Sequence, residues 1–110
     1  MSILKALSDR NRLRIFKLLE RRKMCVCELA FVLGIKQPSV SRHLKKMKDA
    51  GIVDSEQDGL WTQYFLSKKR NVVSTSFVRD LSACLDGEAL IRKDAKMAHR
   101  ADRQDLYTAG

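Results

Sequence analysis

The chain has 110 residues, of which 45% are hydrophobic, and this suits one domain with an ordinary core and leaves no room for a second. Its net charge of +9, from 22 basic against 13 acidic side chains, should attract polyanions, so nucleic acid is the leading partner. The sequence shows no signal-peptide pattern and no apolar run of about 20 residues, which predicts a cytoplasmic protein and no membrane partner.

An amphipathic helix is predicted over residues 11–22, after a shorter apolar stripe that begins at Ile3. Ser8 or Asp9 offers a side-chain oxygen that can cap its first turn. Apolar residues recur along it at helical spacing and should face the core. They are Leu13, Ile15, Phe16, Leu18 and Leu19. The basic residues around this helix are expected to remain in water, namely Arg10, Arg12, Arg14 and Lys17.

A helix-turn-helix is predicted next. Its first helix covers residues 27–33 and ends at Gly34, which can adopt the left-handed conformation of a helix C-terminus. Gln37-Pro38 opens the second helix, because proline is tolerated at the first helical position, and Gly51 ends it. The narrow apolar face of this second helix is formed by Val40, Leu44 and Met47. The helix should therefore be half buried and half basic.

A hairpin and a last helix complete the pattern. Residues 52–56 and 60–66 are typical of two strands around a turn at Gln57-Asp58-Gly59. The last helix is expected from about Ser74, with an apolar side that carries Phe77, Leu81, Cys84, Leu85 and Ile91. The order α-α-α-α-β-β-α predicts a mainly α fold with a small β-hairpin, a winged helix-turn-helix. We expect it to span residues 1–99, followed by a polar tail over residues 100–110.

The basic helix is predicted to enter the major groove of duplex DNA. The residues expected to contact DNA are Gln37, Ser39, Val40, Ser41, Arg42, His43, Lys45 and Lys46, and Arg42 is the best candidate for a guanine. The alternative is that these basic residues only form the solvent-exposed side of the helix. It is disfavoured because short serines stand before them and the first helix of a helix-turn-helix precedes them. A basic RNA-binding or protein-binding winged helix stays open, although aromatic side chains that could stack on bases are few.

Three segments resemble the ArsR family of metalloregulatory repressors, and they are Ala6 to Ile15 (ALSDRNRLRI), Cys25 to Leu29 (CVCEL) and Gln37 to Leu44 (QPSVSRHL). The resemblance covers roughly residues 3–70. It implies a repressor that pairs through its first and last helices, binds operator DNA as a homodimer and releases the DNA when an inducer binds. The sequence contains no nucleophile with its base, phosphate-cradling glycine loop or histidine cluster, so an enzyme is not expected.

Cys25 and Cys27 are the candidate site for the inducer, and we expect them to be reduced. Side chains two residues apart on a regular helix point about 200° from each other, whereas in extended backbone they point the same way. The pair is therefore expected to bind one ion only if the start of the third helix unwinds. This unwinding would move the helix-turn-helix out of register with the major groove of the DNA. The helix N-terminus and the basic residues 21–23 should lower the pKa of the thiols, whereas the charge of Glu28 should raise it.

The number of available ligands then narrows the choice of inducer. By resemblance, arsenite or antimonite, As(III) or Sb(III), fits best, because a pyramidal ion accepts two or three thiolates, whereas Cd, Pb and Zn are less favoured. The nearest arsenic-sensor pattern has a third cysteine where this chain has Ala30, which leaves Cys84 as the remaining candidate for a third ligand. No cofactor is expected for DNA binding itself. Two alternatives stay open for the pair, a thiol redox switch and small buried thiols that only fill space.

Overall fold

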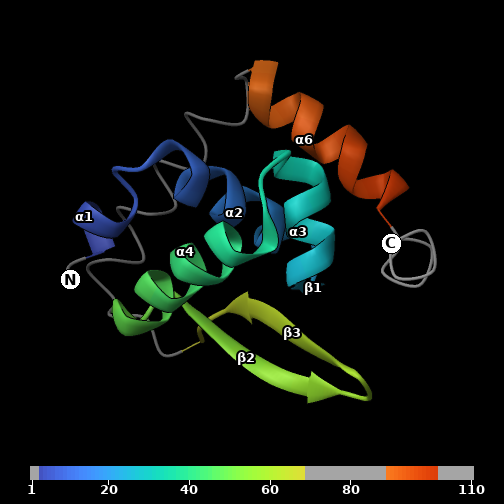
Figure 1. Ribbon diagram of the computed structural model, residues 1–110. Coiled ribbons are helices and arrows are strands. Elements are labelled where there is room, and N and C mark those ends of the chain that lie inside the picture. Colours follow the sequence, from blue (N-terminus) through green and yellow to red (C-terminus); the bar gives the residue numbers. More distant parts are fainter. Residues whose placement is uncertain (1–2, 69–88, 102–110) are drawn as a thin grey trace.

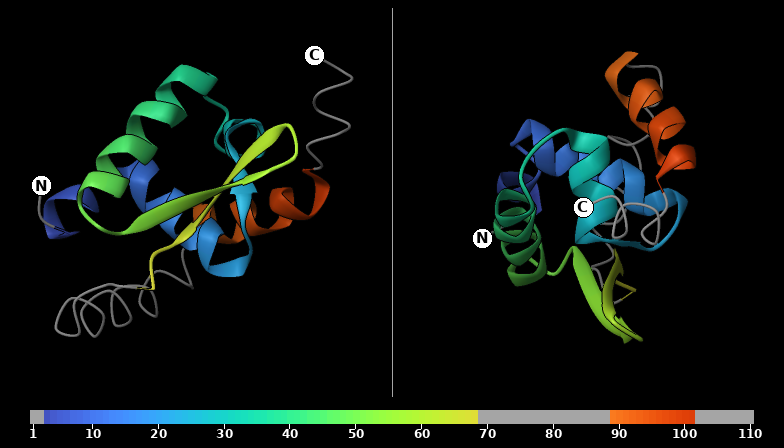
Figure 2. Two further views of the ribbon diagram at one scale, coloured as in Figure 1. Left: turned by 90° about the horizontal axis from the view of Figure 1, so that it is seen from below. Right: turned by 45° about the vertical axis from the view of Figure 1, so that its right-hand side comes forward.

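The computed structural model describes residues 3–68 and 89–101, and it confirms a mainly helical fold with a small antiparallel hairpin. The elements are α1 (Ile3–Ala6), α2 (Arg10–Arg21), β1 (Met24–Cys25), α3 (Val26–Leu33), α4 (Gln37–Asp49), β2 (Val53–Asp58), β3 (Trp61–Leu66) and α6 (Ala89–Arg100). The hairpin projects from the helices as a wing, and α6 lies at the opposite end of the molecule (Figures 1 and 2). The predicted helix residues before Ala89, Cys84 among them, lie outside the described residues.

The N-terminus of α2 is capped as expected, by Asp9. Its carboxylate accepts hydrogen bonds from the backbone N–H groups of Asn11, at 2.8 Å, and Arg12, at 3.1 Å. These groups have no partner within the helix, so the cap stabilises its first turn. The apolar face of α2 is buried and packs against α3, α4, α6 and β3.

Three basic residues of α2 are not in water, and the prediction for them is wrong. Arg12 and Lys17 are each 8% exposed, and the side chain of Arg14 is 13% exposed. Each of them has a polar partner, because Arg12 donates to the carbonyl of Ala6, Lys17 pairs with Glu20 and Arg14 pairs with Asp94. Long basic side chains can cover apolar surface when the charged end finds such a partner.

The helix-turn-helix follows the prediction closely. Gly34 ends α3 with a φ of 71°, and the N–H groups of Gly34 and Ile35 donate to the carbonyl of Ala30. Proline in the first turn opens α4, whose apolar residues Val40, Leu44 and Met47 are fully buried. Because α3 and α4 pack against each other and against α2, the outer face of α4 is held in a fixed orientation.

The turn of the hairpin lies at Gly59-Leu60, whereas the sequence predicted it at Gln57-Asp58-Gly59. Asp58 pairs with Trp61, so β2 runs two residues further toward the tip than predicted, and β3 begins one residue later than predicted. Gly59 has a φ of 61°, which places glycine at the first position of a two-residue turn, where the strand twist favours it. Next to it, Leu60 is exposed, and among the described residues it is the large hydrophobic side chain that lies in solvent.

The sequence did not predict strand β1. It pairs antiparallel with β3, with Met24 opposite Tyr64 and Cys25 opposite Gln63, and the sheet order is β1-β3-β2. Two residues are too few for the alternation that identifies a strand. The consequence is that the chain enters α3 in extended conformation, joined to the wing.

The core lies where α2, α3 and α4 meet the base of the hairpin. Its largest fully buried side chains include Phe16, Leu29, Leu44 and Ile52. Within residues 3–68 and 89–101, no helix combines the length and apolar composition that crossing a bilayer requires.

Candidate DNA-binding face and cysteine site

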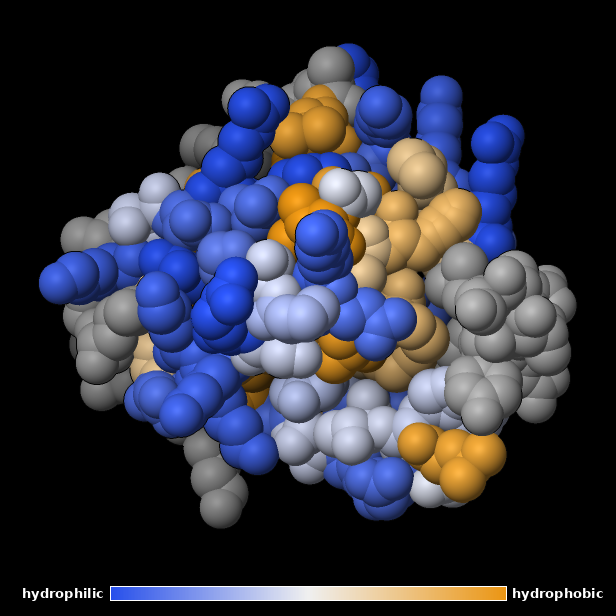
Figure 3. Space-filling view, in the orientation of Figure 1, coloured by the Kyte–Doolittle hydropathy of each residue, from blue (hydrophilic) through white to orange (hydrophobic). Residues whose placement is uncertain are grey.

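The outer face of α4 is polar and basic along its length. Its exposed side chains are Gln37, Ser41, Arg42, Lys45, Lys46 and Lys48. Figure 3 shows hydrophilic residues gathered over the side of the molecule on which α4 lies. Arg42 donates from Nη2 to Ser39 Oγ at 3.1 Å, which holds the guanidinium against the helix surface. This face supplies the hydrogen-bond donors and positive charge that contacts to bases and phosphates require.

Two of the residues predicted to contact DNA have different positions. Val40 is fully buried, because it belongs to the apolar face of α4, so its side chain positions the helix and does not reach the outer face. His43 is half-buried, and its Nδ1 lies 3.4 Å from Arg12 Nη1 at the contact between α4 and α2. Burial lowers the pKa of His43, and the nearby Arg12, Lys46 and Arg42 cations lower it further, against the opposing charge of Asp9.

The Asp9 carboxylate belongs to the same cluster. Burial raises the pKa of this group, but hydrogen bonds from two backbone N–H groups and the charges of His43 and Arg12 outweigh burial, so the pKa of Asp9 is lowered. The cap of α2 and the imidazole of α4 thus lie in one electrostatic environment. This arrangement links the first turn of α2 to the middle of the basic helix.

The sulfur atoms of Cys25 and Cys27 lie 3.0 Å apart. Cys25 precedes α3, with a φ of −91° and a ψ of 169°, and Cys27 is in the first turn of the helix. The prediction that the helix must unwind to bring the two thiols together is therefore wrong, because one of them already stands in extended backbone. Cys25 is buried and Cys27 is half-buried, so a ligand would approach from the side of Cys27.

The prediction of an acidic thiol is also wrong for Cys25. Burial raises its pKa to about 12, and hydrogen bonding with Cys27 and the Glu28 carboxylate add to the rise, against one backbone N–H that lowers it. Two of the three basic residues before the pair are held in ion pairs with carboxylates. Lys23 binds Glu56 at 2.6 Å, and Arg22 binds Glu28 at 3.1 Å.

Glu28 closes the N-terminus of α3 around Cys25. Its Oε1 accepts the Cys25 N–H at 3.0 Å, and Cys25 Sγ accepts the Glu28 N–H, which is the reciprocal pattern of a capping box. Its Oε2 accepts from Arg22 Nη1 at 3.1 Å. The side chain of Glu28 is buried, so both oxygens are satisfied by protein groups.

The described residues do not bring a third ligand to this pair. Over residues 3–68 and 89–101, no group of three or more His, Cys, Asp or Glu side chains is arranged to hold a metal ion. Cys84, the third predicted ligand, lies outside these ranges. The described site is thus a two-sulfur site at the junction of β1 and α3.

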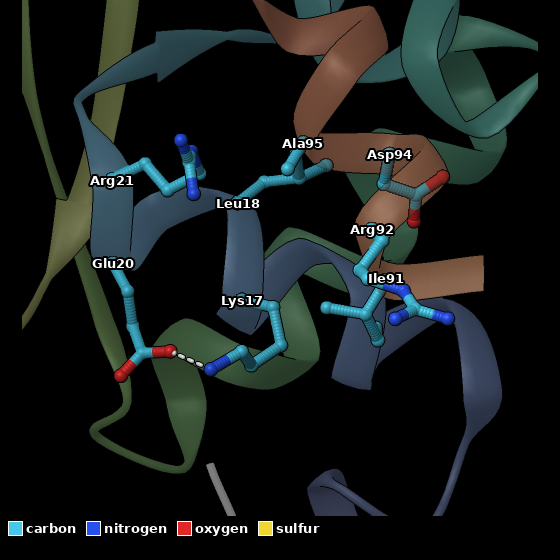
Figure 4. A pocket seen from close by; sticks show the side chains of 8 residues that line it. All are labelled: Lys17, Leu18, Glu20, Arg21, Ile91, Arg92, Asp94 and Ala95. Atoms are coloured by element: carbon cyan, nitrogen blue, oxygen red, sulfur yellow. Dashed lines mark ion pairs between the residues drawn. The ribbon is translucent and has the colours of Figure 1, made fainter. Parts of the chain in front are cut away.

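A separate surface hollow of about 400 Å³ lies between α2 and α6 (Figure 4). Leu18, Ile91 and Ala95 give it an apolar wall. Within it Lys17 Nζ points to Glu20 Oε1 at 2.6 Å. None of the described residues that line this hollow is a cysteine, and neither Cys25 nor Cys27 is among them.

Comparison with known proteins agrees with this geometry. Residues 9–55 match the model of the family described as "Bacterial regulatory protein, arsR family". The chain is 44% identical over 69 residues to an uncharacterized HTH-type transcriptional regulator of Methanocaldococcus jannaschii, a match that covers 62% of this chain and 78% of that protein. It is 28% identical over 109 residues to the arsenical resistance operon repressor of Escherichia coli, covering 96% and 93%. It is 40% identical over 63 residues to the cadmium resistance regulatory protein CadC of Listeria innocua, covering 56% and 53%.

Solved structures show the same architecture. Reduced HlyU from Vibrio cholerae superposes with a TM-score of 0.63 at 26% identity, over 76% of this chain and 80% of that one. The homodimeric winged helix-turn-helix domain of Mb0332 from Mycobacterium bovis has a TM-score of 0.62 at 25% identity, over 76% and 77%. The structure has a helix-turn-helix with a wing and a basic outer face on α4, and the sequence matches regulators of the same kind. The chain belongs to the arsR family of bacterial regulatory proteins.

Proposed function

We propose that the chain is a repressor that binds operator DNA as a homodimer and releases it when As(III) or Sb(III) binds Cys25 and Cys27. The observation that carries the proposal is the separation of 3.0 Å between the two sulfur atoms. Two thiols at this distance, with one of them half-buried, form a ready pair of soft donors. The pair stands at the start of the helix-turn-helix, where a bound ion can act on DNA recognition.

The number of sulfur ligands favours a pyramidal ion over a tetrahedral one. A tetrahedral metal usually takes four ligands, whereas a pyramidal ion accepts two or three thiolates, and the described residues supply two. The relative in Escherichia coli is named as an arsenical resistance repressor, whereas the Listeria innocua relative is named for cadmium resistance, so cadmium is the competing inducer.

Arsenite also suits a buried neutral thiol. When As(OH)₃ reacts with two thiols, two As–O bonds break, two As–S bonds form, and the thiol protons leave with the hydroxides as two water molecules. The reaction balances without creating a net charge in the site. The pKa of about 12 at Cys25 therefore does not prevent this ligand from binding, although it opposes a ligand that must displace protons into solvent.

The position of the pair offers two routes from ligand to DNA. Cys25 pairs with Gln63 in β3, so movement of its backbone reaches the wing. Cys27 is in α3, which packs against α4, so movement there reaches the basic helix. On α4 we assign base contacts to Gln37, Ser39, Ser41 and Arg42, and phosphate contacts to Lys45 and Lys46. A homodimer doubles these contacts and relates two half-sites by two-fold symmetry.

The test is binding to the DNA upstream of the chain's own gene, with and without arsenite. We expect Cys25→Ser and Cys27→Ser to bind this DNA like the native protein and to keep it when arsenite is added. Cys84→Ser serves as the matched control, and release by this variant at native arsenite concentrations assigns the switch to the pair alone. Equal release by all three variants contradicts the proposal, and release by peroxide but not by arsenite replaces it with a thiol redox switch.

A further inference from the structure

The guanidinium of Arg22 joins the cysteine site to the C-terminal end of α6. Nη1 donates to Glu28 Oε2 at 3.1 Å, and Nη2 donates to the carbonyls of Ala98, at 3.1 Å, and Ala101, at 3.2 Å. The last carbonyls of a helix have no partner within it, and a cation near them is favourable. One side chain therefore caps the end of α6 and holds the carboxylate that caps the start of α3.

The connection continues to the sulfur-bearing residue through Glu28. Its Oε1 accepts the backbone N–H of Cys25 at 3.0 Å, so the position of this carboxylate follows the backbone of Cys25. Binding a ligand between two sulfurs that now stand 3.0 Å apart must open their separation, and Cys25 is the member outside the helix. Glu28 then has to shift or lose a hydrogen bond.

The planar fork of a guanidinium fixes the angle between its donors. If the Glu28 carboxylate shifts, Arg22 Nη1 therefore cannot stay hydrogen-bonded to it while Arg22 Nη2 keeps its bonds to Ala98 and Ala101. Resting on the function proposed above, we infer that Arg22 is a positioning residue that transmits occupation of the cysteine pair to the last helix. It touches neither sulfur atom and does not lie on the outer face of α4, so its effect is on coupling and not on either binding site.

The experiment measures the operator affinity of the full-length protein with and without saturating arsenite, together with arsenite binding to the DNA-free protein from its ultraviolet absorption band. In the native protein we expect arsenite to weaken DNA binding by about tenfold or more. In Arg22→Gln this factor should fall below about threefold, with arsenite affinity retained. Because coupling is reciprocal, DNA should weaken arsenite binding by the same reduced factor.

Two further variants separate geometry from charge. Arg22→Lys keeps the charge but lacks the fork, and we expect it to lose coupling like Arg22→Gln. Arg21→Gln removes the same charge from the neighbouring exposed position, which makes none of these hydrogen bonds, and should couple like the native protein. Circular dichroism of each variant establishes that it is folded.

A readout at the helix itself completes the test. Arsenite should speed amide hydrogen exchange in the last turn of α6 in the native protein, whereas in Arg22→Gln this exchange should be fast with or without arsenite. A native coupling factor that survives in Arg22→Gln overturns this inference and leaves the proposed function intact. Absence of any arsenite effect on the native protein overturns the proposed function, and the inference with it.

Discussion

Arg14 and Asp94 form a two-point ion pair between α2 and α6. Arg14 Nε donates to Asp94 Oδ2 at 2.8 Å, and Nη2 donates to Oδ1 at 2.9 Å. The Asp94 side chain is 3% exposed, so its charge depends on this partner. Parallel hydrogen bonds of this kind fix orientation as well as distance. The pair therefore sets how α6 lies on α2.

We expect Asp94→Ala to destabilise the protein by about 3 kcal/mol, because the Arg14 guanidinium loses its carboxylate partner in a mostly buried position and keeps only a neutral acceptor, Asn11 Oδ1 at 3.2 Å. Replacing both residues by apolar ones of similar size, as in Arg14→Met with Asp94→Leu, should cost clearly less. Urea unfolding at one fixed protein concentration measures both, since a dimer's stability depends on concentration. Equal losses in the single and the double variant contradict this account of the pair.

The cap of α2 has a predictable pH dependence. Asp9→Ala should cost about 1 kcal/mol at neutral pH, because two N–H groups lose their acceptor. Asp9→Asn keeps an acceptor oxygen but not the charge. The pKa of Asp9 is lower when the protein is folded, so the stability that its charge adds is present above the unfolded pKa and is lost as pH falls through the folded one.

Thermal unfolding of the native and Asp9→Asn proteins between neutral and acidic pH checks this sign. The difference between the two proteins should shrink only in the acid range, where the native carboxylate becomes protonated. A constant difference across the whole range means that the charge of Asp9 does not contribute.

The helix-turn-helix could be predicted from the sequence because its signals are local. Val40, Leu44 and Met47 repeat at helical spacing, and Gly34 and Pro38 mark the turn and the start of α4. These signals depend on residues close together in the chain, and the structure follows them. The burial of Arg14 had no such signal, because its partner lies 80 residues away.

The arrangement of the two thiols could not be predicted from the sequence. The predicted start of α3 at Cys27 and the observed start at Val26 both leave Cys25 outside the helix. The sequence did not predict that Cys25 pairs with Gln63 of β3, because this pairing joins residues far apart in the chain. The pairing holds Cys25 in extended backbone, and this backbone brings its sulfur close to that of Cys27.

Two substitutions on α4 should separate base contacts from phosphate contacts. Arg42→Ala should cost about 1–3 kcal/mol of operator affinity and relax the preference at one base pair, because a bidentate contact to guanine is lost. Lys46→Ala should weaken binding to all sequences alike and reduce the slope of log affinity against log salt by about 0.9 for each phosphate contact removed.

Fluorescence anisotropy with the operator and with scrambled DNA, at several salt concentrations, measures both effects. Arg92→Ala is the matched control, since it removes one positive charge from α6, at the end of the molecule opposite the wing. If Arg42→Ala lowers affinity equally for operator and scrambled DNA, Arg42 contacts phosphate and the assignment to a base is wrong.

The pH dependence of ligand binding should distinguish arsenite from cadmium at the cysteine pair. Cd²⁺ must displace the Cys25 proton into solvent, and because the pKa of this thiol is about 12, the affinity should rise by about tenfold or more for each pH unit between pH 6 and 8. Arsenite carries hydroxides that leave with the thiol protons as water, so its affinity should change by less than about threefold over the same range. Titrations of the DNA-free protein followed by ultraviolet absorbance give both curves. A steep rise for arsenite would show that its binding releases protons to solvent, and would remove the reason for preferring a neutral metalloid at this site.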